Sequence, residues 1–153
     1  MSMTRANPSQ AYPSVDELVP HDAPMILVDE LVEWSPTEAL VRATVRSGGA
    51  FVVDGRVPGT VLLEYMAQAI AVADGMSARI TGKTDVGLLL GTRELSLACD
   101  HVAVGDVLDV RVRQEFADAS VARYACEVAR AGDRLADAVV NVMLAPPDEV
   151  LRR

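Results

Sequence analysis

The sequence is poor in cysteine and histidine, and this shortage limits the kinds of site that it can form. Among 153 residues there are two histidines and two cysteines, and the cysteines, Cys99 and Cys126, are far apart and lack the spacing of a metal site. We expect both to be reduced, buried thiols, as is usual in the cytoplasm. Neither a disulfide framework nor a cysteine-bound metal is indicated.

Long apolar runs are also missing. A membrane-spanning helix needs about 20 consecutive apolar residues, and the best candidate is interrupted by Glu64 and Asp74. Residues 1–19 lack the apolar core of a secretory signal. We therefore predict a cytoplasmic protein without a membrane span.

Basic residues are too few for wholesale binding of nucleic acid. There are 14 Lys and Arg against 22 Asp and Glu, which gives a formal net charge of −8, whereas a duplex is held mostly through Lys and Arg on its phosphates. Half of the residues are apolar and about a quarter are charged, which is typical of a folded domain. We expect residues 1–153 to form one domain, with residues 1–13 loosely ordered.

Alternating polarity predicts a set of antiparallel strands. In residues 107–116, Leu108, Val110 and Val112 fall on one face and charged residues fall on the other. Short turns join the later segments, so these strands should pair antiparallel. The expected strands are residues 25–34, 39–47, 86–98, 107–116, 121–130 and 134–144.

One long helix is expected from about Gly59 to about Ile80. Its apolar residues cover every side, which is typical of a helix surrounded by the rest of the protein. The fold class that follows is α+β: a long central helix wrapped by an antiparallel sheet of five or six strands.

Glu64 is the unusual residue in this helix. Gln68 follows it by one helical turn and shares its face. Burial would favour the neutral acid form of Glu64, which can protonate a departing hydroxyl group, while Gln68 holds the side chain by a hydrogen bond. The alternative is a structural glutamate that pairs with a strand residue or a neighbouring subunit.

The residues before the helix could bind an oxyanion. Pro58 and Gly59 leave room for a carbonyl group to approach the free N–H groups of the first turn, which the helix dipole makes electropositive. Such donors stabilise the oxyanion that forms on a thioester or ester carbonyl. The alternative is an ordinary transition from loop to helix.

Two stretches, HDAPMILVDELVE (residues 21–33) and PGTVLLEYMAQAIAV (residues 58–72), resemble a known family. They are similar to the hotdog-fold 3-hydroxyacyl-acyl carrier protein dehydratases, and most similar to the divergent branch found in aryl polyene pathways. The resemblance runs over about residues 17–145. It implies a hotdog fold, a dimer with its active sites at the interface, a substrate carried on phosphopantetheine, and no metal or organic cofactor.

The resemblance also implies roles for individual residues. Glu64 matches the helix carboxylate that protonates the leaving hydroxyl, and Gly59 matches the glycine whose N–H faces the thioester carbonyl. Gln68 matches a supporting glutamine. Position 50, where the common pattern has its catalytic histidine, is Ala50.

The general base is therefore not assigned. The two histidines are His21, which lies in the opening motif, and His101, which we expect to be solvated. His21, or a histidine from a partner chain in a mixed dimer, could remove the α-proton.

Three hypotheses follow. The first is a dehydratase that eliminates water from 3-hydroxyacyl thioesters on acyl carrier protein to give 2,3-enoyl thioesters. The second is a hotdog thioesterase in which Glu64 activates water, and the third is a non-catalytic acyl-binding subunit of a mixed dimer. The motifs favour the first hypothesis.

Arg56 is a further candidate for substrate binding. It lies just before Pro58 and Gly59, where a pantetheine arm would enter. Because acyl carrier proteins are acidic, their docking needs local positive charge. Asp54 could instead neutralise Arg56 in an internal ion pair.

Overall fold

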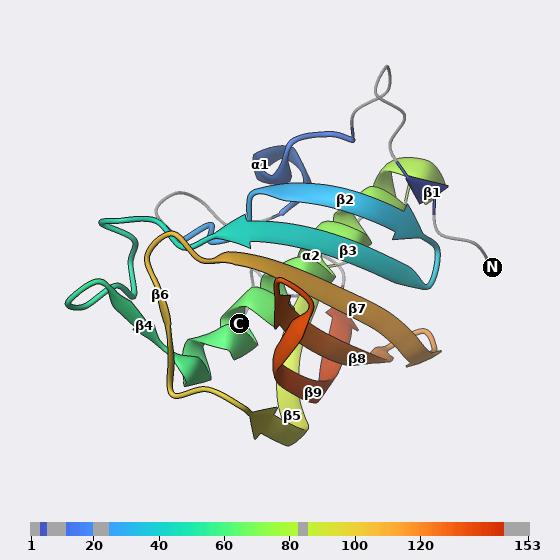
Figure 1. The fold of residues 1–153 in the computed structure, drawn as a ribbon. Helices are drawn as coiled ribbons and strands as arrows, with labels where there is room; N and C mark the ends of the chain where they lie inside the picture. Colours follow the sequence, from blue (N-terminus) through green and yellow to red (C-terminus); the bar gives the residue numbers. More distant parts are fainter. Residues whose placement is uncertain (1–3, 6–11, 20–24, 83–85, 146–153) are drawn as a thin grey trace.

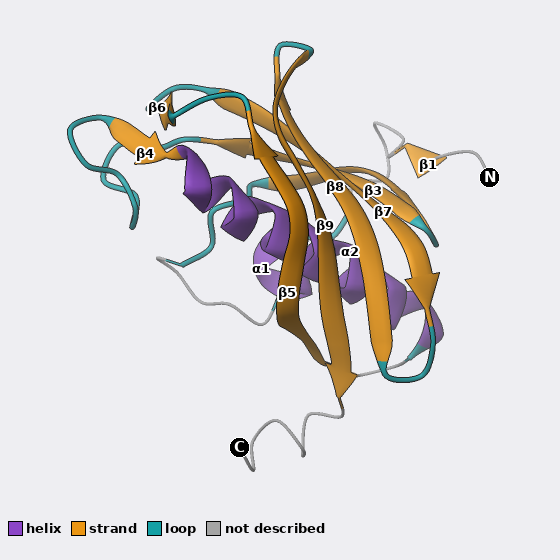
Figure 2. Cartoon of the chain, turned by 90° about the horizontal axis from the view of Figure 1, so that it is seen from below, coloured by secondary structure: helices purple, strands orange, loops and turns teal. Residues whose placement is uncertain are grey.

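The computed structural model places a long helix against a curved sheet (Figures 1 and 2). It describes residues 4–5, 12–19, 25–82 and 86–145. The helices are α1 (Val15–Leu18), the short 3₁₀ helix η1 (Gly59–Val61) and α2 (Leu62–Thr81). The strands are β1 (Thr4–Arg5), β2 (Glu30–Ser35), β3 (Glu38–Thr44), β4 (Arg56–Pro58), β5 (Val86–Leu97), β6 (His101–Ala103), β7 (Val107–Ala117), β8 (Val121–Arg130) and β9 (Asp133–Ala145).

The main sheet is antiparallel, with the strand order β1-β2-β3-β7-β8-β9-β5. Six of its strands are long, and β1 adds two residues at one edge. Strand β5 forms the other edge, and among the described strands it pairs only with β9. Strands β4 and β6 form a separate two-stranded sheet beside the start of α2 (Figure 1). The expected helix wrapped by antiparallel strands is confirmed.

The alternating sequence of β7 explains how the sheet meets the helix. Leu108, Val110 and Val112 are almost completely buried, whereas Arg111 between them reaches the outer face and pairs with Glu38. The same period of two repeats along β3 and β8. Because one face of each strand is apolar, the sheet can cover the helix and keep its other face polar.

Turn residues fix the register of the later strands. The connection from β8 to β9 has Ala131 at φ 51° and Gly132 at φ 85°. Two successive residues with positive φ form the type of tight turn that suits the twist of a hairpin. In β5, the pairing with β9 shifts between Leu89 and Gly91, which marks a bulge at this glycine.

Helix α2 supplies the centre of the core. Leu62, Met66 and Val72 are inaccessible to solvent, and Gly82 ends the helix with φ 75°, a conformation that glycine adopts without strain. On one side α2 touches the backbone of α1, where a Cβ atom at Gly75 would lie 2.0 Å from the carbonyl oxygen of Leu18. The close approach of the two helices therefore requires glycine at this position.

Some expectations need correction. The strand expected at residues 25–34 begins only at Glu30, and the short pair β4 and β6 was not predicted. Of the segment 1–13, which was expected to be loosely ordered, Thr4 and Arg5 form a strand, and residues 1–3 and 6–11 lie outside the described residues. Both cysteines are free thiols as expected, but Cys99 is only half-buried.

No helix in the described part of the chain is long and apolar enough to cross a membrane.

Candidate functional site

The start of the central helix is held by the small sheet. Strand β4 pairs with β6, with Pro58 opposite His101. At the next residue, the Gly59 N–H donates a hydrogen bond to the Asp100 carbonyl oxygen at 2.8 Å. A Cβ atom at position 59 would lie 2.6 Å from the Cys99 carbonyl oxygen, so this close contact requires glycine. Gly59 thus joins the helix start to the residues that lead into β6.

This hydrogen bond corrects the expectation for Gly59. Its N–H was expected to be open to a substrate carbonyl, but the donor is occupied by Asp100. Thr60, the next residue, is exposed. As the second residue of the helix, Thr60 has no acceptor within the helix for its N–H, and we find none elsewhere in the described chain. The first open donor is thus one residue further along than expected.

Gln68 connects the helix carboxylate to a distant part of the chain. Its Nε2 donates to Glu64 Oε1 at 3.0 Å and to the Met25 carbonyl oxygen at 2.6 Å. Its Oε1 accepts a hydrogen bond from the Leu27 N–H at 2.7 Å. Gln68 is inaccessible to solvent, and all its amide groups are used. The side chain therefore holds both the carboxylate and the extended segment before β2 in fixed positions.

Glu64 itself is more accessible than expected. It is half-buried, whereas Gln68 is fully buried. The predicted contact between the two residues is confirmed, but the predicted burial holds for Gln68 alone. A carboxyl group that is oriented by a buried amide and still reachable from outside can exchange a proton with a bound molecule.

The general base remains without an assignment in this chain. His21 lies outside the described residues. His101 is exposed on β6, as expected, but its place opposite Pro58 was not foreseen, because β4 and β6 were not predicted. Ala50 lies on the loop after β3 and is exposed. No group of three or more potential metal-binding side chains is found among the described residues.

Arg56 is exposed at the outer end of β4. The alternative that Asp54 neutralises it is wrong, because in the described chain we find no carboxylate within ion-pair distance of Arg56. Asp54 instead takes part in a tight turn, with φ 53° followed by φ 73° at Gly55. Arg56 thus leaves a positive charge beside the helix start. Another arginine, Arg79, lies in the last turn of α2, where its Nη2 is 3.7 Å from Glu17 Oε2.

A cavity of about 230 Å³ lies beside the site, under the loop that carries Ala50. Tyr65, next to Glu64 on α2, contributes to its wall. The other lining residues are Ile26, Leu27, Thr44, Val45, Arg46, Ser47, Gly48, Gly49, Ala50, Phe51, Val52 and Val57. Sequence reasoning missed Tyr65, because in a helix that is apolar on all sides an aromatic residue looks like ordinary core.

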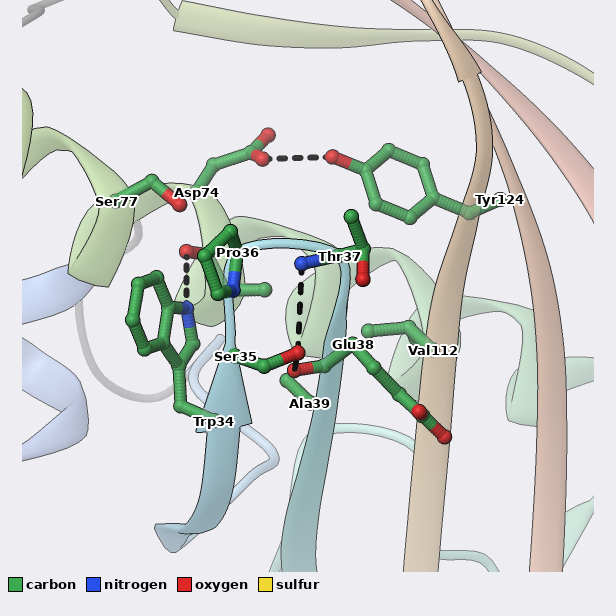
Figure 3. Close-up of a pocket in the computed structure, with 11 residues that line it drawn as sticks. Trp34, Ser35, Pro36, Thr37, Glu38, Ala39, Asp74, Ser77, Val112 and Tyr124 are labelled. Atoms are coloured by element: carbon green, nitrogen blue, oxygen red, sulfur yellow. Dashed lines mark hydrogen bonds between the residues drawn. The ribbon is translucent and has the colours of Figure 1, made fainter. Parts of the chain in front are cut away.

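A second polar cluster lies further along the helix, at Asp74 (Figure 3). The Tyr124 hydroxyl donates to Asp74 Oδ1 at 2.8 Å, and Trp34 Nε1 donates to the Ala73 carbonyl oxygen at 3.3 Å. Desolvation raises the pKa of Asp74 to about 6, although the hydrogen bond from Tyr124 opposes this shift. The neighbouring cavity of about 10 Å³ has the size of a single water molecule. This cluster fastens α2 to the sheet and is too small to hold a substrate.

Comparison with known families decides the class of the protein. The family model of the ApeP-like dehydratases, described as ApeP dehydratase, matches residues 13–152. The chain belongs to the ApeP-like dehydratase family. The expected relation to hotdog 3-hydroxyacyl-acyl carrier protein dehydratases is thereby confirmed.

Individual relatives agree with this assignment. The chain is 26% identical over 135 residues to the 3-hydroxyacyl-[acyl-carrier-protein] dehydratase FabZ of Wolbachia sp. subsp. Brugia malayi, with 84% of this chain and 92% of the relative covered. It is 27% identical over 134 residues to FabZ of Rickettsia bellii, with 84% and 91% covered. Among solved structures, the dehydratase heterocomplex ApeI:P from Xenorhabdus doucetiae matches with a TM-score of 0.85 and 28% identity, over 92% of this chain and 97% of that chain.

Proposed function

We propose that this dehydratase removes water from 3-hydroxyacyl thioesters carried by acyl carrier protein, in fatty acid or polyene biosynthesis. The observation that carries the proposal is the position of Glu64, whose Oε1 accepts a hydrogen bond of 3.0 Å from Nε2 of the buried Gln68. The chain that holds this carboxylate belongs to a dehydratase family. A carboxyl group in this position suits the role of general acid.

The proposed reaction is an elimination. A base removes the α-proton at C2, the electron pair of that C–H bond forms the C2–C3 double bond, and the C3–O bond breaks. Glu64 gives its proton to the departing hydroxyl, which leaves as water. An N–H donor near the helix start polarises the thioester carbonyl and stabilises the enolate-like charge. We assign this donor to Thr60 instead of Gly59, because the Gly59 N–H is bound to Asp100.

The proposal assigns the base to a partner chain. The sequence has Ala50 at the position of the family's usual histidine, and one solved structure that resembles this chain is the dehydratase heterocomplex ApeI:P. The outer edge of β5 is free to pair with another strand, and Leu95 and Leu97 are exposed there. A mixed dimer with a hotdog subunit that carries the histidine would complete the site. His21 stays a candidate within this chain.

Substrate delivery is proposed to use Arg56. Its exposed, unneutralised charge lies just before the helix start that bears Thr60 and Glu64. An acidic carrier protein that docks there would place its phosphopantetheine arm at the site. The proposed chemistry is proton transfer alone and uses no metal or organic cofactor.

The decisive test is a dehydration assay on 3-hydroxyacyl-carrier substrate, with the chain alone and with a hotdog partner subunit. We expect enoyl product with the partner, and a loss of at least about a hundredfold in kcat for Glu64→Gln. Glu115→Gln, a change of the same kind on β7, is the matched control and should retain activity. Unchanged dehydration in Glu64→Gln would disprove the role of this residue.

The same assay separates the other hypotheses. Release of free acid and carrier thiol would identify a thioesterase. Dehydration by the mixture that is unaffected by Glu64→Gln, together with binding of substrate by this chain, would identify a non-catalytic subunit. Activity of the chain alone that is lost in His21→Ala would assign the base to His21.

A further inference from the structure

Tyr65 is a buried residue whose hydroxyl group has no hydrogen-bond partner among the described residues. The residue is 3% exposed, and within the described chain we find no hydrogen-bond partner for its side chain. Buried polar groups are almost always paired, since an unpaired one loses its bonds to water without replacement. An unsatisfied hydroxyl in the wall of a cavity therefore points to a molecule that binds there.

The cavity beside Tyr65 is large enough to take a part of a ligand. Its volume of about 230 Å³ exceeds the roughly 150 Å³ of an engineered protein cavity that binds benzene. Leu27, Val45 and Val57 give it apolar walls, and the loop of residues 47–52 forms its other side. The site thus suits an apolar chain or ring that carries one hydrogen-bonding atom facing Tyr65.

The charge state of Tyr65 fixes its part in such a contact. Desolvation raises the pKa of the phenol, while the nearby positive charge of Arg46 opposes the shift. The group is therefore neutral at physiological pH and keeps its proton. It can donate that proton to an oxygen acceptor.

We propose that this cavity is an acyl-binding subsite in which the Tyr65 hydroxyl donates a hydrogen bond to an oxygen atom on the distal part of the acyl chain. The inference rests on the proposed function for the identity of the ligand. Glu64 and Tyr65 are successive residues on α2, so their side chains leave the helix about 100° apart. Gln68 binds Glu64, and its other partner, Leu27, lines the cavity together with Tyr65. Tyr65 therefore serves a different oxygen from the 3-hydroxyl that Glu64 protonates. The substrates selected are acyl chains that carry an additional oxygen beyond C3.

The test measures binding without turnover. The probes are two pantetheine amides, in which nitrogen replaces the thioester sulfur: one with a 3-hydroxyoctanoyl group and one with a 3,8-dihydroxyoctanoyl group. Calorimetric titration of the full chain, in complex with its hotdog partner where one is required, should show about three- to tenfold tighter binding of the dihydroxy probe. In Tyr65→Phe this preference should disappear, with affinity for the 3-hydroxyoctanoyl probe unchanged.

Tyr124→Phe is the matched control, because it also removes one phenol oxygen but at the Asp74 cluster. It should lower the melting temperature and keep the preference for the dihydroxy probe, whereas Tyr65→Phe should not lower the melting temperature.

Ala50→Leu places a larger side chain on the loop that lines the cavity, so it should weaken the binding of both probes. A preference that persists in Tyr65→Phe, or equal binding of the two probes by the unaltered protein, would overturn the proposal. Weaker binding of the hotdog partner by Tyr65→Phe, without any change in probe selectivity, would also overturn the proposal.

Because these readouts need no catalysis, they are independent of the Glu64 assay. Loss of dehydration in Glu64→Gln with equal probe affinities would reject the subsite alone. Intact selectivity with unaffected dehydration in Glu64→Gln would reject the acid assignment alone.

Discussion

Gly59 and Thr60 are neighbours at the helix start, but their backbone N–H groups differ in their partners. The Gly59 N–H donates a hydrogen bond to the Asp100 carbonyl oxygen, whereas the Thr60 N–H has no acceptor among the described residues. We predict that Thr60→Pro, which removes the N–H, lowers kcat by about 10²- to 10³-fold, the usual effect of losing one oxyanion donor. Proline is tolerated in the first turn of a helix.

Thr60→Ala keeps the N–H and removes only the side chain, so it should retain most of the activity. The measurement is kcat on 3-hydroxyacyl-carrier substrate, together with the melting temperature of each variant. Equal activity of the proline and alanine variants would show that a group other than the Thr60 N–H donates the hydrogen bond to the thioester carbonyl.

Asp74 gives a prediction about pH. Its pKa is about 6 in the folded protein against an ordinary value of 3.8, so the folded state binds more protons than the unfolded state between these values. The free energy of unfolding should therefore fall as the pH rises from 4 to 6, and the full penalty should be present above pH 6. Asp74→Asn keeps an acceptor for Tyr124 and should be more stable than the native chain by about 2 kcal/mol at pH 8, after a reduction for partial solvent exposure. At pH 4 and below, the difference should vanish.

Asp118 is the control with the opposite sign. Hydrogen bonds from the Ser120 and Val121 N–H groups hold the pKa of Asp118 below its usual value. Asp118→Asn should therefore lose stability relative to the native chain, and the loss should shrink when acid protonates the native carboxylate. Urea unfolding at several pH values measures both variants. A constant stability difference for Asp74→Asn across this range would contradict the prediction.

The sequence identified single residues where polarity broke an apolar pattern, as with Glu64 and Gln68. It did not identify Tyr65, because the unpaired state of a hydroxyl depends on neighbours from β3 and the following loop. It also could not reveal that Asp100 occupies the Gly59 N–H, since residues 59 and 100 meet only through tertiary pairing.

At the scale of elements, the close contact between α1 and α2 leads to a prediction at Gly75. Alanine is normally favoured over glycine within a helix by about 1 kcal/mol. Here, a Cβ atom would lie 2.0 Å from the Leu18 carbonyl oxygen, a backbone atom that cannot move without displacing α1. Gly75→Ala should therefore lower the free energy of unfolding by about 1–3 kcal/mol, as in other overpacked sites. Urea unfolding provides the measurement, and increased stability, as helix propensity alone predicts, would contradict the close approach.

Long elements were predictable because their periodicity repeats over many residues. Strands β7, β8 and β9 and helix α2 lie close to their expected bounds. Strands β4 and β6 have three residues each, too few for a period to be recognised. Residues 25–29 have an apolar composition like that of a strand, but the hydrogen bonds of Met25 and Leu27 go to the Gln68 side chain. Sequence alone does not distinguish such a segment from a strand.

At the scale of the whole molecule, the unpaired edge of β5 predicts how the protein assembles. Leu95 and Leu97 are 37% and 39% exposed on this strand. The double change Leu95→Lys and Leu97→Lys should abolish or strongly weaken association with a hotdog partner, because it places charge at an apolar edge. The melting temperature of the isolated chain should change little.

Phe116→Lys is the control, since Phe116 is also apolar and 51% exposed but belongs to β7. Light scattering after size-exclusion chromatography measures complex formation, and dehydration by the mixture should fall in parallel. A complex that survives the β5 change and dissociates with Phe116→Lys would place the interface elsewhere.

The Gln68 amide recognises residues 25 and 27 through main-chain atoms, so their side chains take no part in holding it. Replacements at Ile26 and Leu27 should therefore alter the shape of the neighbouring cavity, while Gln68 keeps its hydrogen bond to Glu64. Position 68 allows no such freedom, because glutamate lacks the amide donor and asparagine is shorter. Residues 26 and 27 are therefore a natural starting point for an engineer who wishes to change which molecule the cavity accepts, because the hydrogen bond between Gln68 and Glu64 is left untouched.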